Sequence, residues 1–90
     1  MDLRTYCDQL PPGGMSAFAG DLGITPVYLS QLAARQNGRE PSPALCVAIE
    51  RATDLIVRRW DLRPSDWSLI WPELIGLKGA PRATSAARAA

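Results

Sequence analysis

Apolar residues recur at helical spacing near the start of the chain. In the segment 15–22 they fall at positions i, i+3, i+4 and i+7, which lie on one face of a helix. These residues are Met15, Phe18, Ala19 and Leu22. Gly23 follows them, and glycine suits the position just past a helix end because it enters the left-handed conformation without a Cβ penalty. The pattern predicts a helix that ends at Gly23.

A second helix is predicted to start directly afterwards. Thr25 offers an N-cap hydroxyl, and the missing N–H of Pro26 is harmless at the first helical position. Ile24 and Leu29 have the spacing of a hydrophobic staple. The inward residues are Leu29, Leu32 and Ala33, and the outward ones are Val27, Ser30, Gln31 and Ala34, with Tyr28 and Arg35 at the margins. Two such helices around a tight turn are typical of a helix-turn-helix, whose second helix enters the DNA major groove. An ordinary helical hairpin in an all-α core is the alternative.

The remaining pattern predicts supporting helices. Asp2 is placed to cap a first helix over 3–10, and Ser42 with Pro43 opens another that runs to about Thr53. Ser65 is placed to cap a last helix, whose apolar residues are Trp67, Ile70, Trp71 and Leu74. Residues 55–62 are rich in β-branched and apolar residues without clean alternation, so a short extended segment there stays open. The expected fold class is all-α, with about five short helices.

A loop without periodicity follows the second helix of the pair and contains the turn signal Asn37-Gly38. Its position suggests that Arg35, Asn37 and Arg39 reach phosphates, which fix the register of a protein on a duplex without reading sequence. A solvated loop with no partner is the alternative, and it weighs about equally for Arg39.

Length and charge refine this picture. Ninety residues with 47% hydrophobic content allow one modest domain, expected over 1–75. This part carries seven arginines against nine acids, a net charge of −2, whereas residues 76–90 carry three basic residues and no acid. The latter are expected to form a flexible basic tail, rich in alanine, with weak nonspecific DNA contact. Residues 25–39 hold two arginines and no acid, so the proposed reading side is the least repelled by DNA.

The composition also argues against several classes of function. The chain has no histidine and only two cysteines, far apart in sequence, so a metal site, a cofactor and a disulfide are not expected. Cys7 and Cys46 are interpreted as buried small hydrophobes. No nucleophile with a neighbouring base and no phosphate-binding loop is found, which makes an enzyme the weakest class. No apolar run approaches the length of a membrane span, and we expect a cytoplasmic protein.

Three tryptophans lie within twelve positions near the end of the expected domain: Trp60, Trp67 and Trp71. They predict either a lid over the core or an oligomerisation surface. The second interpretation supports a rival function, in which the protein is an interaction module or an antitoxin that grips a protein partner.

Several motifs together resemble the YdaS family of Cro-like helix-turn-helix proteins from bacterial prophages, often described as antitoxins. The motifs, in chain order, are Gly-Ile-Thr-Pro-Val-Tyr-Leu-Ser-Gln-Leu from Gly23, Ser42-Pro43, Cys-Val-Ala-Ile-Glu-Arg-Ala-Thr from Cys46, Asp-Leu-Arg-Pro-Ser-Asp-Trp from Asp61 and Ile-Trp-Pro-Glu-Leu from Ile70. The chain departs from the family at Asp54-Leu55, where a glycine pair is favoured, and at Trp60. The resemblance implies a λ-repressor-like fold, a recognition helix over 26–34, operator binding and control of neighbouring prophage genes.

The predicted DNA-binding residues are Thr25, Pro26, Val27, Tyr28, Ser30, Gln31, Arg35, Asn37 and Arg39. Among them, Thr25, Tyr28 and Arg35 are expected to hold phosphates, Gln31 and Ser30 to read base edges, and Val27 to touch a thymine methyl. The expected partners are operator DNA and a second copy of the chain, because one small reader with little positive charge binds poorly. A toxin or another phage protein is the alternative partner.

Overall fold

Six α-helices and two short 3₁₀ helices make up the computed structural model, which describes residues 1–82. In chain order they are α1 (Leu3–Asp8), α2 (Gly14–Leu22), α3 (Pro26–Ala33), η1 (Gln36–Gly38), α4 (Pro43–Ala52), α5 (Arg59–Leu62), α6 (Trp67–Ile70) and η2 (Pro72–Leu74). No strand occurs in this part of the chain. The expected all-α class is confirmed.

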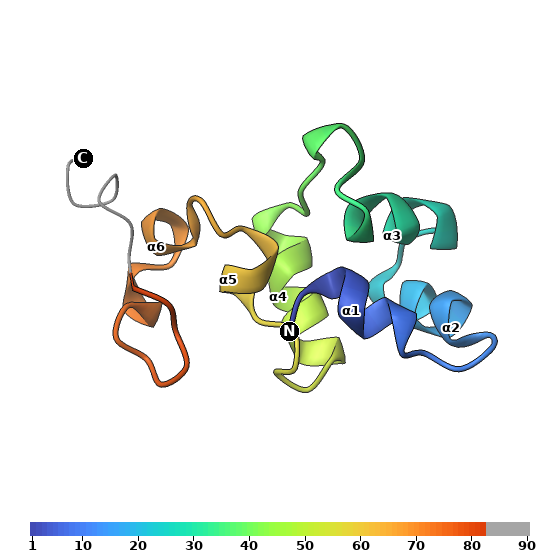
Figure 1. Cartoon of the computed structure of the whole chain (residues 1–90), viewed down its shortest axis with the longest axis horizontal. Coiled ribbons are helices and arrows are strands. Elements are labelled where there is room, and N and C mark those ends of the chain that lie inside the picture. Colours follow the sequence, from blue (N-terminus) through green and yellow to red (C-terminus); the bar gives the residue numbers. More distant parts are fainter. Residues whose placement is uncertain (83–90) are drawn as a thin grey trace.

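The helices form an elongated molecule of 43 × 28 × 19 Å (Figure 1). At one end α2 packs against α3 and α4, and α1 packs against α3. At the other end α5 contacts α4 and α6, and η2 follows α6. The helix-turn-helix therefore lies at one end of the molecule, and the tryptophan-rich segments lie at the other.

Local capping fixes where three helices begin, as the sequence predicts. The carboxylate of Asp2 accepts a hydrogen bond from Thr5 N at 2.7 Å, and this bond lowers the pKa of Asp2. The hydroxyl oxygens of Thr25 and Ser42 accept from the backbone N–H groups three residues on, at 3.1 and 3.3 Å. Gly23 ends α2 in the left-handed conformation, with φ 73°. These four predictions are confirmed.

The segment 55–62, whose state was open, contains no strand. Asp54 and Leu55 adopt left-handed backbone conformations, with φ 55° and 67°, and turn the chain after α4. Val57 is then buried, and α5 begins where the Asp61 carboxylate accepts from Arg58 N at 2.9 Å. Two consecutive non-glycine residues thus make this left-handed turn.

The last helix differs from the prediction at its start. Asp66, not Ser65, occupies the N-cap of α6, and its carboxylate accepts two hydrogen bonds from Arg63, at 2.8 and 3.0 Å. The apolar stripe expected on one helix is divided between α6 and η2, because Pro72 cannot supply the N–H that would continue α6.

Of the two interpretations of the tryptophans, burial supports the lid over the core. Trp60, Trp67 and Trp71 are only 8%, 1% and 8% exposed, and all three belong to the hydrophobic core. The rings of Trp60 and Trp67 meet edge to face with centroids 5.8 Å apart. The three side chains therefore form part of the core and are largely covered within the chain.

An ion-pair cluster covers the outer side of the same tryptophans. The guanidinium groups of Arg58 and Arg59 lie 4.4 Å and 5.2 Å from the ring centroids of Trp60 and Trp71. Both arginines pair with the buried carboxylate of Glu50, at 2.9 and 3.2 Å. The ion pairs of Arg58 and Arg59 with Glu50 thus cover the core at Trp60 and Trp71.

The chain continues past η2 in hydrogen-bonded turns. Leu77 N donates to Leu74 O and Ala80 N donates to Leu77 O, at 3.0 and 2.9 Å, and Ala80 packs against the core. The predicted flexible tail over 76–90 lies, for residues 83–90, outside the described residues.

Candidate nucleic-acid interface

The outward face of α3 is exposed to solvent. Leu29 and Leu32 hold the opposite side of α3 in the core, whereas Val27 is 68% exposed. The outward side chains line an open groove of about 580 Å³, together with one residue of η1. These lining residues are Val27, Ser30, Gln31, Ala34 and Gln36. The outward orientation expected for the first four of them is confirmed.

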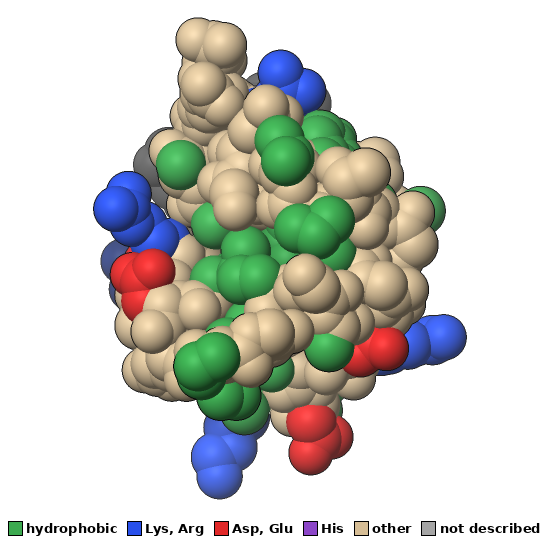
Figure 2. All heavy atoms as spheres, turned by 90° about the vertical axis from the view of Figure 1, so that its right-hand side faces the viewer, with side chains coloured by type: hydrophobic (Ala, Val, Ile, Leu, Met, Phe, Trp, Pro, Cys, Tyr) green, Lys and Arg blue, Asp and Glu red, His purple; other side chains and the backbone are tan. Residues whose placement is uncertain are grey.

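The centre of this end of the molecule is free of charge among the described residues. Figure 2 shows the end that carries α2 and α3, with hydrophobic side chains gathered in the middle and Lys, Arg, Asp and Glu at the margins. Uncharged polar and small apolar side chains can contact base edges and thymine methyl groups without a large desolvation cost. The composition of the face therefore suits direct contact with bases.

The start of α3 offers polar groups next to this face. The Thr25 hydroxyl oxygen accepts from Tyr28 N at 3.1 Å, which leaves its own proton available for donation. Arg39 comes from the loop that follows η1, and its guanidinium lies 5.7 Å from the centroid of the Tyr28 ring. The structure thus brings Thr25, Tyr28 and Arg39 together at one edge of α3.

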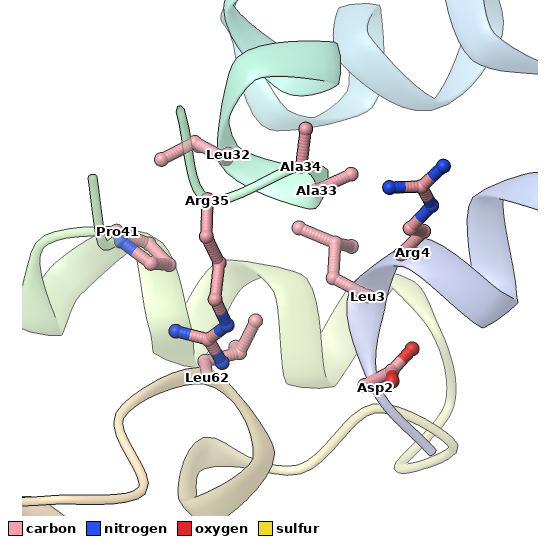
Figure 3. A pocket seen from close by; sticks show the side chains of 9 residues that line it. All are labelled: Asp2, Leu3, Arg4, Leu32, Ala33, Ala34, Arg35, Pro41 and Leu62. Carbon is pink, nitrogen blue, oxygen red and sulfur yellow. The ribbon is translucent and has the colours of Figure 1, made fainter. Parts of the chain in front are cut away.

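Arg35 is separated from the other predicted site residues. Its backbone is left-handed, with φ 52°, and its guanidinium donates to Asp61 O at 2.9 Å and pairs with Glu40 at 3.6 Å. In Figure 3 the side chain runs from the end of α3 toward Leu62 of α5. Arg35 therefore links the end of α3 to α5 through its bond to Asp61 O, while its side chain stays 44% exposed.

The remaining predicted residues lie around the same helix. Pro26 begins α3 and is exposed, and Asn37 is exposed within η1 with φ 57°. Gln36 lines the groove but was not predicted, because the turn signal Asn37-Gly38 does not show that the turn brings Gln36 beside α3. The positive φ values of Arg35 and Asn37 produce that turn.

A smaller hollow of about 240 Å³ lies between α1, the end of α3 and α5 (Figure 3). Asp2, Arg4 and Arg35 contribute its charged groups, and Pro41 and Leu62 contribute to its apolar wall. The Arg35 guanidinium bonds within the protein here, as described above.

The cysteines behave as structural residues. Cys46 is buried and its thiol donates to Pro41 O at 3.7 Å, and burial raises the pKa of this thiol to about 11. Burial also raises the pKa of the half-buried Cys7. Over residues 1–82 no group of three or more His, Cys, Asp or Glu side chains is placed to hold a metal ion, and no helix is long and apolar enough to cross a membrane.

A capped helix pair around a left-handed glycine packs on a small helical core, so the protein is a small all-α protein. The chain belongs to the family described as bacterial toxin YdaS, whose model matches residues 4–70. This match confirms the resemblance found in the sequence, although the family description names a toxin where the resemblance implied an antitoxin. No curated protein matches the chain.

Proposed function

We propose that the protein is a sequence-specific DNA-binding regulator that reads an operator with the outward face of α3 and represses neighbouring prophage genes. The observation that carries this proposal is the presentation of α3. Its start is fixed by Thr25, its inner side is held by Leu29 and Leu32, and its outer side is exposed and uncharged. A rigid helix with such a face suits insertion into a major groove.

Within this proposal, Gln31 and Ser30 read base edges and Val27 contacts a thymine methyl. The Thr25 hydroxyl and Arg39 hold phosphates at the start of α3. Since Arg35 bonds to Asp61 O, its role is to position the loop that carries Arg39. The action is proposed to be non-enzymatic.

The family description as a toxin is compatible with this function. A repressor that blocks transcription of a gene needed for growth acts as a toxin without a catalytic group. The rival proposal, a module that grips a protein partner, loses the tryptophan surface on which it was based, because those side chains are buried.

We further propose that the protein binds as a homo-oligomer. Recognition helices of dimeric helix-turn-helix proteins reach half-sites about one helical turn, or roughly 34 Å, apart. Sedimentation of the free protein and of the DNA complex tests this. A monomer in both states would contradict it.

The decisive experiment is fluorescence anisotropy with duplexes that tile the intergenic region upstream of the gene, together with a shuffled control, at low and physiological salt. We expect saturable binding to one tile that survives physiological salt and weakens steeply as salt rises, because phosphate contacts release counterions. Binding without preference among the tiles, or the absence of binding, would contradict the proposal.

Gln31→Ala tests the reading residue. Glutamine can bond adenine through two hydrogen bonds worth about 1–3 kcal/mol of discrimination, so the variant should lose roughly 5- to 160-fold in preference for the operator over shuffled DNA. Nonspecific affinity should change little. An unchanged preference would exclude Gln31 as a base reader.

A further inference from the structure

Two edges flank the outward face of α3. Successive helical residues are rotated by about 100°, which places Tyr28 and Ala33 on opposite sides of the face, each roughly 110° from its centre. The face itself is formed by Val27, Ser30, Gln31 and Ala34. Any basic group at either edge would lie beside the face and not within it.

Among the described residues, an exposed arginine lies next to each edge, and the two come from different elements; Arg35, which also lines the hollow of Figure 3, bonds to Asp61 O. Arg39 stacks over the Tyr28 ring at one edge. At the other edge, Arg4 of α1 lines a hollow of about 330 Å³ together with Ser30, Ala33 and Ala34. Arg4 also lines the hollow of Figure 3, where it projects from α1 beside Ala33 and Ala34.

Arg4 is available for a ligand. Its side chain is 70% exposed, and its Nε lies 4.0 Å from a carboxylate oxygen of the equally exposed Asp8. An exposed ion pair at this distance contributes little to stability. Arg4 can therefore leave the Asp8 carboxylate and pair with another anion at little cost in free energy. By contrast, the side chains of Arg58, Arg59 and Arg63 are about one fifth exposed and are engaged in ion pairs.

We propose that Arg4 is a phosphate-binding residue of the DNA interface and that Arg4 and Arg39 hold the backbones on the two sides of the major groove entered by α3. This inference rests on the proposed function. The groove is about 12 Å wide and has phosphates along both rims, and a guanidinium matches a phosphate through two parallel hydrogen bonds. Contacts of Arg4 and Arg39 with phosphates on the two rims would centre α3 in the groove without depending on the base sequence.

Salt dependence separates a phosphate contact from other effects. Each lost phosphate contact lowers the magnitude of the slope of log K against log salt by about 0.9. The probe is a mixed-sequence duplex of about 20 base pairs, two helical turns, titrated by anisotropy at several salt concentrations. The variants are Arg4→Gln, Arg4→Lys, Arg39→Gln and the control Arg51→Gln, each first checked for a folded circular dichroism spectrum. Arg51 is exposed near the end of α4 and lines none of the hollows along α3.

We expect Arg4→Gln and Arg39→Gln each to reduce the magnitude of the slope of log K against log salt by about 0.9 per bound chain. Arg4→Lys should keep most of the wild-type slope, and Arg51→Gln should keep all of it. A wild-type slope for Arg4→Gln, with a lowered one for Arg39→Gln, would overturn the role of Arg4 alone. A change in Arg51→Gln as large as that in Arg4→Gln would also overturn it, since the effect would then follow net charge. Wild-type protein that does not bind the duplex at any salt would overturn the proposed function itself.

Discussion

Thr53 allows a sharp test of how the turn after α4 is held. The Thr53 side chain is 2% exposed, its hydroxyl donates to Ile49 O at 2.8 Å, and its oxygen accepts from Val57 N at 3.1 Å. Val57 is fully buried, so no solvent reaches its N–H in the folded state. One hydroxyl thus connects the last turn of α4 to the segment that leads into α5.

Thr53→Val replaces this hydroxyl by a methyl group of nearly the same size. Ile49 O keeps the hydrogen bond from Thr53 N, at 3.0 Å, whereas Val57 N loses its partner. A buried donor left without a partner costs about 1–3 kcal/mol. Thr53→Ser keeps both hydroxyl bonds and loses one methyl, a change of about 0.8 kcal/mol. We therefore expect the valine variant to be the less stable, by roughly 1 kcal/mol relative to the serine variant.

The measurement is urea denaturation followed by circular dichroism and tryptophan fluorescence, with the free energy of unfolding compared at equal m values. A serine variant as unstable as the valine variant would refute the reasoning, since packing of the methyl and not the hydroxyl would then dominate. A valine variant as stable as the wild type would show that the Val57 N–H finds another partner.

Two further predictions concern glycine and cysteine. Gly20 lies within α2 and Gly23 just after it, and a Cβ added at either meets no atom within 4 Å, but only Gly23 has a positive φ. Gly20→Ala should raise the free energy of unfolding by about 0.5–1 kcal/mol, and Gly23→Ala should lower it by about 1 kcal/mol, both by urea denaturation; equal effects would contradict the argument. Because the pKa of Cys46 is about 11, only about one Cys46 thiol in a thousand is ionised at pH 8. Cys7 should therefore be alkylated first, and the rate of Cys46 alkylation should rise with pH. Mass spectrometry of the alkylated protein checks this order, and faster labelling of Cys46 would contradict it.

The features that could be predicted from the sequence depend on residues within about one helical turn of one another. The Asp2, Thr25 and Ser42 caps bond to backbone groups three residues away, and Gly23 needs only its own backbone freedom. The inward and outward sides of α3 follow from helical periodicity alone. These local determinants also gave the helix-turn-helix and most of its exposed face.

The features that escaped prediction depend on residues far apart in sequence. The hydrogen bond from Arg35 to the carbonyl of Asp61 joins residues 26 positions apart and was not predicted. Trp60 and Trp71 are covered by Arg58 and Arg59, which pair with the Glu50 carboxylate. The spacing of apolar residues in the sequence does not indicate such a cluster of charges. Arg4 belongs to α1, which the sequence predicted only as a supporting helix. The packing of α1 on α3 brings Arg4 next to the outward face of α3.

The outward side chains of α3 make no hydrogen bond to other side chains within the described part of the chain, and they carry no charge. Exchanging them leaves the core, the caps and the net charge as they are. Under the proposed function, natural selection can therefore alter the DNA target in a few mutational steps without a loss of foldability. One scaffold can in this way give rise to a population of regulators that address different sites and do not interfere with one another.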